Sequence, residues 1–263
     1  MKLVVLCDNN TYIDNYLLGE PALSFYIENG EDKILFDTGY SNVFLSNAKT
    51  MNIDLNEVNK VVLSHGHNDH TNGLKSLKNN LKLYYCEGCF DKKYGDGLNV
   101  SAPYSEKEVK DKFDSQKVTK CTEISKNLYI LGPIPRTTDF ENENTNLKIK
   151  VGKNFVQDNM NDDTALVYDS NKGIYIITGC SHSGICNIVS YTKTIFNKKI
   201  AMIIGGLHLF NDDEKSQKTI EFLKNENIKE LYPCHCTSLT VKSKMMQAEL
   251  NVKEVGSGLI LDI

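Results

Sequence analysis

The sequence lacks an excess of positive charge, and this absence argues against one class of partner. Its 30 Lys and Arg residues are outnumbered by 34 Asp and Glu residues, which leaves a net charge of −4. Proteins that bind nucleic acid without sequence preference carry a basic surface. We therefore expect a small-molecule substrate and no nucleic-acid partner.

The sequence also lacks any apolar run approaching the ~18 residues that span a bilayer. It begins with MKLVVLCDNN, which has only a short apolar stretch and no small-residue cleavage site of a signal peptide. These absences predict a protein that has no membrane partner and stays in the cytoplasm.

A disulfide framework is not expected either, because the thiols of a cytoplasmic protein stay reduced. The spacing Cys86-Glu-Gly-Cys89 resembles half of a zinc site or a redox pair, but no second Cys-x-x-Cys accompanies it. We interpret these two as ordinary cysteines near a strand end. The cysteines occupy positions 7, 86, 89, 121, 180, 186, 234 and 236.

Short apolar runs alternate with helical patterns along the chain, and continuous apolar runs are typical of strands covered on both faces. This order predicts an α/β architecture in which sheets are layered against helices. Helical patterns cover residues 43–51, 185–196 and 212–225. The expected strands are residues 2–6, 23–28, 33–36, 61–63, 81–85, 128–131, 165–168, 174–178, 200–204, 230–232 and 259–261.

Residues 90–161 have weak periodicity and many Lys, Asp, Asn and Glu side chains. We interpret them as a loop-rich segment of a single domain that covers residues 1–263. Such a segment could form a lid over a site. A poorly ordered surface excursion is the alternative interpretation.

The most informative run is VVLSHGHNDHTNGL, residues 61–74. An apolar strand is followed within a few residues by His65, His67, Asp69 and His70. Imidazole and carboxylate groups are ligands that suit zinc, iron or manganese, and Gly66 gives the backbone freedom to aim its neighbours. A polar turn that happens to be rich in histidine is the alternative, but so many donors directly after a buried strand favour a metal site.

The three remaining histidines also follow strand-like runs. His182 stands in TGCSHSG, His208 in GGLHL and His235 in PCHCT. Each one alone could be an ordinary core or surface histidine. Because none of the six histidines lies elsewhere, they indicate one converging site.

These motifs resemble those of a known family. HGHNDH matches the HxHxDH signature of the metallo-β-lactamase-like hydrolases, and LFDTG (residues 35–39) resembles the Asp-bearing motif that precedes it there. Within that superfamily the chain is similar to the dihydropterin-ribofuranosylaminobenzene-phosphate synthase-like proteins. The resemblance extends over nearly the whole chain and implies an αββα sandwich, two β-sheets face to face with helices outside. The similar pieces are ALSFYIENGEDKILFDTG, LSHGHNDHTNGL, PIPRTTDFE, DDTALVYDSNKGIYIITGCSHSGICNIV, IIGGLHLF and YPCHCTS.

The resemblance implies a binuclear site for two divalent metal ions, with zinc favoured over iron or manganese. His65 and His67 would bind the first ion. Asp69 and His70 would bind the second, which His235 would complete.

The sequence departs from the superfamily pattern where a bridging Asp is common, because it reads Thr178-Gly179-Cys180 there. We infer that His182 supplies the third ligand of the first ion. Cys180 would replace the bridging carboxylate as a thiolate ligand, or it is a buried structural thiol. The resemblance also makes Asp37 a supporting residue. It would hold the segment from His65 to His70, called the histidine loop below, by hydrogen bonds.

Two further residues have open roles. His208 could shuttle a proton or contact the substrate, or it could be a histidine that is merely beside the site. Arg136 could grip a phosphate or carboxylate with its planar guanidinium, or it could form a surface salt bridge with Asp139 or Glu141.

The favoured function is hydrolysis, because a bound metal lowers the pKa of its water from 15.7 to about 7. Asp69 would orient the nucleophile and His208 would protonate the leaving group of a small phosphoester, ester or lactone-type substrate. A redox di-iron protein is an alternative, but its relatives have a glutamate at the position of His67. A metal-binding sensor without turnover is another alternative, and the acidic balance disfavours a nucleic-acid-processing relative. The name of the subgroup implies a pterin or ribosyl-phosphate substrate, and the fold alone does not choose among substrates.

Overall fold

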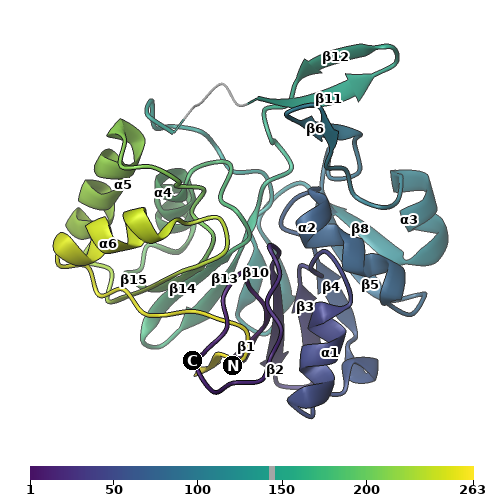
Figure 1. The fold of residues 1–263 in the computed structure, drawn as a ribbon, viewed down its shortest axis with the longest axis horizontal. Helices are drawn as coiled ribbons and strands as arrows, with labels where there is room; N and C mark the ends of the chain where they lie inside the picture. The colour runs from purple at the N-terminus through teal and green to yellow at the C-terminus, as the bar shows by residue number, and fades with distance from the viewer. Residues whose placement is uncertain (142–145) are drawn as a thin grey trace. The chain divides into compact units, whose positions relative to one another are not determined.

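A computed structural model describes residues 1–141 and 146–263 (Figure 1). The described residues form two compact units. Unit 1 comprises residues 1–119, 146–162 and 256–263, and unit 2 comprises residues 120–141 and 163–255. Unit 1 contains two sheets and unit 2 one, each unit together with helices, which confirms the α/β class. The expectation of a single domain stays a prediction.

Unit 1 contains a seven-stranded sheet in the order β17-β1-β2-β3-β4-β5-β8. Its first strands pair antiparallel, whereas β3, β4, β5 and β8 pair parallel. The carboxyl ends of parallel neighbours therefore meet at one edge of this sheet. The bounds are β1 (Lys2–Cys7), β2 (Ser24–Asn29), β3 (Asp32–Phe36), β4 (Lys60–Val62), β5 (Lys82–Cys86), β8 (Asp114–Val118), β17 (Ile260–Asp262), α1 (Val43–Thr50), α2 (Asn68–Thr71) and α3 (Glu106–Lys112).

The core of unit 1 forms from the apolar runs of this sheet and from the helices packed on it. Phe44 and Ala48 of α1 are buried in one cluster with Val4, Leu35 and Val61 of the strands. Burial of such side chains contributes about 1.5–3 kcal/mol each. The strand that carries the histidine loop is thereby held in this core by Val61.

Residues 90–161 contain more regular structure than we expected. A four-stranded sheet in the order β12-β11-β6-β7 belongs to unit 1. The side chains of β11 and β12 are mostly exposed. Strand β11 reads LKIKV, an alternation of apolar and polar residues that we did not interpret as a strand, whereas β12 reads NFVQ and has no such alternation. The bounds are β6 (Lys93–Gly95), β7 (Leu98–Asn99), β11 (Leu147–Val151) and β12 (Asn154–Gln157).

Unit 2 contains a six-stranded sheet in the order β16-β15-β14-β13-β10-β9. Strands β14, β15 and β16 are parallel neighbours, so the segments that follow them meet at one edge of the sheet. Figure 1 shows α4, α5 and α6 together beside this sheet. The bounds are β9 (Thr122–Ser125), β10 (Leu128–Ile130), β13 (Ala165–Ser170), β14 (Gly173–Thr178), β15 (Ile200–Gly205), β16 (Glu230–Pro233), α4 (Ile185–Phe196), α5 (Glu214–Asn225) and α6 (Leu239–Gln247).

The three expected helices are confirmed as α1, α4 and α5. Helices α3 and α6 were not expected from the sequence. Only Val109 is buried on α3, and only Val241 and Met245 are buried on α6, so neither has a full apolar stripe. No helix in residues 1–141 or 146–263 is long and apolar enough to cross a membrane.

Helix α4 begins directly after Gly184, and a distant side chain holds this beginning. The Glu141 carboxyl group accepts the backbone N–H groups of Cys186 and Asn187, both at 2.9 Å, and the Thr138 hydroxyl at 3.0 Å. The first N–H groups of a helix have no partner within it. Gly184 leaves the room for this contact, because a Cβ there would lie 2.2 Å from a Glu141 oxygen.

Replacing Glu141 by Ala should destabilise unit 2 by about 1–3 kcal/mol, because buried N–H groups then lose their acceptor. Urea unfolding followed by circular dichroism measures this loss. Glu221→Ala removes an exposed carboxyl group from α5 and serves as the control. Equal midpoints for the two variants would contradict the role given to Glu141.

Candidate metal centre

The histidine loop of unit 1 follows β4 directly. Strand β3 runs parallel to β4, so Asp37 after one strand lies beside Ser64 after the other. The backbone confirms this alignment, because the Asp37 N–H donates to the Val62 carbonyl oxygen at 2.9 Å. The sheet thus places a carboxyl group beneath the loop that carries His65.

The Asp37 carboxyl group connects three parts of this loop. One oxygen accepts the Ser64 backbone N–H at 2.8 Å, and the other accepts the Ser64 hydroxyl at 2.6 Å. The second oxygen also lies 2.7 Å from His70 Nδ1. All three residues are fully buried. In this position Asp37 restricts the directions that the loop side chains can take.

These hydrogen bonds also determine which imidazole nitrogens can bind a metal. The Ser64 hydroxyl gives its proton to Asp37, so its contact with His65 Nδ1 at 2.9 Å is best served when that nitrogen carries the hydrogen. His65 Nε2 then keeps its lone pair. By the same reasoning, His70 donates from Nδ1 to Asp37 and keeps the lone pair on Nε2.

The donor geometry in unit 1 fits a metal ion. His65 Nε2 and His67 Nδ1 are 3.0 Å apart, and two nitrogens on one tetrahedral zinc ion lie about 3.3 Å apart. His70 Nε2 and Asp69 Oδ2 form a second pair at 3.5 Å. Imidazole and carboxylate groups are also the donor types that zinc takes. The residues present therefore fit the predicted ligand roles.

His67 is in the protonation state that a ligand needs. Burial lowers its pKa to about 3, although the nearby Asp69 opposes the shift. The imidazole is therefore neutral at pH 7, and a lone pair is available for a metal ion.

A buried ionic cluster that the sequence analysis missed supports the same loop. Lys93 Nζ lies 2.7 Å from Asp158 and 2.9 Å from Asp162, and Asp162 accepts the Gly66 N–H at 2.8 Å. Burial alone would lower the pKa of Lys93, but the two aspartates outweigh it and raise the pKa, so the ammonium group stays charged. Gly66 needs to be glycine, because a Cβ there would lie 1.9 Å from the Cys89 carbonyl oxygen.

This ionic cluster has no recognisable signature in the sequence. Lys93 and Asp158 lie in residues 90–161, which we interpreted as loop-rich and where Lys and Asp are common, and Asp162 directly follows that segment. A lysine at the start of a short strand, as Lys93 is in β6, cannot be distinguished by pattern from a solvated one. Only its burial, at 1% exposed, shows that it holds the loop.

Unit 2 gathers the other predicted residues at the edge where β14, β15 and β16 end. Ligand atoms of Cys180, His235 and Cys236 all lie within 4.8 Å of one another. Burial would raise the pKa of the Cys236 thiol, but hydrogen bonds with Cys180 and His208 and the nearby charge of His235 hold it well below its usual value. Cys236 was not among the expected ligands, although it is adjacent to His235 in PCHCT.

His182 and His208 lie beside this group, with ring centroids 4.2 Å apart. Arg136 donates from Nη1 to the His182 carbonyl oxygen at 3.2 Å. The next turn is held by Asp163, which accepts the backbone N–H of Ser183 at 2.9 Å and its hydroxyl at 2.5 Å. The predicted residues of unit 2 therefore occupy one region of that unit.

The expected site residues thus lie in two clusters, one in each unit. The cluster of unit 1 contains His65, His67, Asp69, His70 and the supporting Asp37. The cluster of unit 2 contains Cys180, His182, His208, His235 and Arg136. The assignment of both clusters to one binuclear centre, with His182 and His235 as ligands, stays a prediction.

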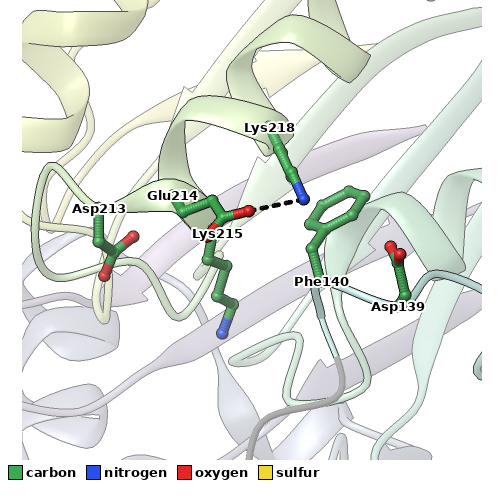
Figure 2. Close-up of a pocket in the computed structure, with 6 residues that line it drawn as sticks. All are labelled: Asp139, Phe140, Asp213, Glu214, Lys215 and Lys218. Carbon is green, nitrogen blue, oxygen red and sulfur yellow. Dashed lines mark ion pairs between the residues drawn. The ribbon is translucent and has the colours of Figure 1, made fainter.

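A pocket of about 400 Å³ in unit 2 is lined by other residues (Figure 2). Lys218 lies 2.8 Å from Glu214 and stands over the Phe140 ring. Among the residues that the structure describes, no histidine or cysteine lines the pocket. Its lining consists of Asp139, Phe140, Asp213, Glu214, Lys215 and Lys218.

The model of the metallo-beta-lactamase superfamily matches residues 17–122. An uncharacterized protein of Methanocaldococcus jannaschii, MJ0448, is 32% identical over 249 residues, which cover 92% of this chain and 93% of the relative. The chain belongs to the metallo-beta-lactamase superfamily. This membership confirms the expected family and fold class.

Two further relatives are informative. The structure of Tm1679, a metal-dependent hydrolase of the beta-lactamase superfamily, has a TM-score of 0.88 and 30% identity, and the match covers 100% of this chain and 99% of that one. The 7,8-dihydropterin-6-methyl-4-(beta-D-ribofuranosyl)-aminobenzene-5'-phosphate synthase of M. jannaschii is 29% identical, with 94% of this chain and 91% of the relative covered. The expected resemblance to synthase-like members is thereby confirmed. One relative is a hydrolase and the other a synthase, so the family does not decide the reaction.

Replacing Lys93 by Met should destabilise the protein by about 3–5 kcal/mol, because two buried carboxyl groups lose their cation. It should also weaken metal binding, because Asp162 then holds Gly66 less firmly. Urea unfolding and the metal content of the purified variant measure the two effects. Lys92→Met, which removes the exposed neighbour, is the matched control, and similar losses in both variants would refute the proposed support.

Proposed function

We propose that this protein is a metal-dependent hydrolase of a small phosphoester, ester or lactone-type substrate in the cytoplasm. The observation that carries the proposal is the pair of imidazole nitrogens 3.0 Å apart in the histidine loop. The 30% identity with Tm1679 over the full chain supports it further.

The proposed ligand sets follow the superfamily pattern except at the third ligand of the first ion, which we assign to His182. His65, His67 and His182 would hold one zinc ion, and Asp69, His70 and His235 would hold a second. Bound zinc would supply a nucleophilic water at neutral pH and would polarise the substrate. Iron and manganese are alternatives, because the same donors suit them.

The chain's own residues would position the reactants and the protons. Asp37 holds the His70 ring by its Nδ1, and Asp69 would orient the attacking water. His208 Nδ1 is buried and has no hydrogen-bond partner among the residues that the structure describes. It is therefore the atom at which His208 would hold the proton that a leaving group needs. Arg136 would bind a phosphate or carboxylate of the substrate.

A synthase reaction is the second candidate, favoured by the 29% identity with the dihydropterin-ribofuranosylaminobenzene phosphate synthase. The substrate would then carry a pterin or a ribosyl phosphate. Arg136 would serve that phosphate as well as it would serve a phosphoester. The two candidates therefore differ in the reaction and share the predicted metal site.

His67→Ala should lower bound metal by at least one ion per chain and reduce hydrolysis at least 100-fold, because an imidazole ligand is lost. Elemental analysis and assays with generic phosphodiester and ester substrates measure the two effects. Lys92→Met, purified and assayed in the same way, again serves as the control and should keep both metal and activity.

Unchanged metal content and unchanged hydrolysis in His67→Ala would refute the proposal. A metal-loaded wild type that hydrolyses nothing in a broad panel would favour the synthase or a sensor without turnover. Bound iron with oxygen-dependent activity would favour a redox di-iron protein instead.

A further inference from the structure

Unit 2 contains a group of sulfur and nitrogen donors that the proposed ligand sets do not fully use. Cys180 follows β14, and His235 and Cys236 follow β16, which β15 separates from β14 in the sheet. Their ligand atoms all lie within 4.8 Å of one another. Two thiols and an imidazole from two separate loops thus converge on one point.

The absence of a side chain at Gly206 leaves room for the Cys236 sulfur. Gly206 lies beyond the end of β15, and a Cβ there would lie 2.4 Å from Cys236 Sγ and 2.5 Å from the Gly179 carbonyl oxygen. Any side chain at Gly206 would therefore displace the sulfur or the Cys180 loop. The close approach requires glycine at this position.

The loops that carry the donors are also conformationally strained. His235 has a φ of 49° and Ser181, next to Cys180, has a φ of 58°. Residues other than glycine adopt this left-handed region at an energetic cost. Strain of this kind collects at functional sites, where the surrounding structure imposes it.

We propose that Cys180, Cys236 and His235 together form a thiolate-containing site for zinc, in which Cys236 is a direct ligand. The inference rests on the proposed function in one respect, because this ion would be the second of the two. Thiolate sulfur and imidazole nitrogen are the donor types that zinc takes in proteins. They select zinc over magnesium, calcium or manganese, which prefer oxygen ligands.

Cobalt(II) substitution tests this site directly, because a cobalt–thiolate bond produces an intense near-ultraviolet absorption that imidazole and carboxylate ligands do not. The full chain is stripped of metal under reducing conditions and titrated with cobalt(II). We expect this absorption in the wild type, about half of its intensity in Cys236→Ser or Cys180→Ser, and none in the double variant. The cobalt dissociation constant should rise at least 10-fold in each single variant, since one ligand is weakened.

Cys121→Ser is the matched control, because Cys121 is a partly buried thiol of the same unit that belongs to none of the donor groups. It should keep the full sulfur absorption. Gly206→Ala is a second variant that keeps every donor, and it should also lose part of the band if the sulfur needs this space. Circular dichroism shows whether each variant is folded.

The outcomes separate this inference from the proposed function. If cobalt binds and His67→Ala removes it, but no sulfur absorption appears, the thiolate site is overturned and the hydrolase proposal stands. If no metal binds at all, both are overturned. If the absorption is absent and the unfolded, unreduced protein has two fewer than its eight thiols, Cys180 and Cys236 form a disulfide and the thiolate site is again overturned.

Discussion

The histidine loop depends on the hydrogen bonds of one buried group, the carboxyl group of Asp37. It bonds the backbone and the hydroxyl of Ser64 and the ring of His70. Through the Ser64 hydroxyl it also favours one tautomer of His65. One side chain thus determines both where the histidines point and which nitrogens carry lone pairs.

This arrangement exists because β3 and β4 are parallel neighbours. Their carboxyl ends meet at one edge, so residues 27 positions apart in the chain come into contact. A second support reaches the same loop from residues 93–162, where Lys93 neutralises the aspartate that holds Gly66. The loop is therefore held at both ends by groups that are not themselves expected to touch a metal ion.

The sequence predicted the strands near the site well and their surroundings poorly. Buried parallel strands such as β4 and β15 are continuous apolar runs, and the donors follow them directly, so both could be recognised from local pattern. Strands β11 and β12 have exposed side chains, and the buried state of Lys93 depends on partners more than 60 residues away. Neither property is visible in a local window. The metal roles of His182 and His235 rest on resemblance and stay predictions.

Several residues at these loops are held in a backbone conformation that disfavours them. Asp37, His208 and His235 all have φ near 50–60°, where glycine would relieve the strain. A laboratory selection for resistance to heat alone would therefore tend to replace these residues by glycine. Such a selection would yield a more stable chain without its chemistry, because these three strained positions carry donor and supporting side chains.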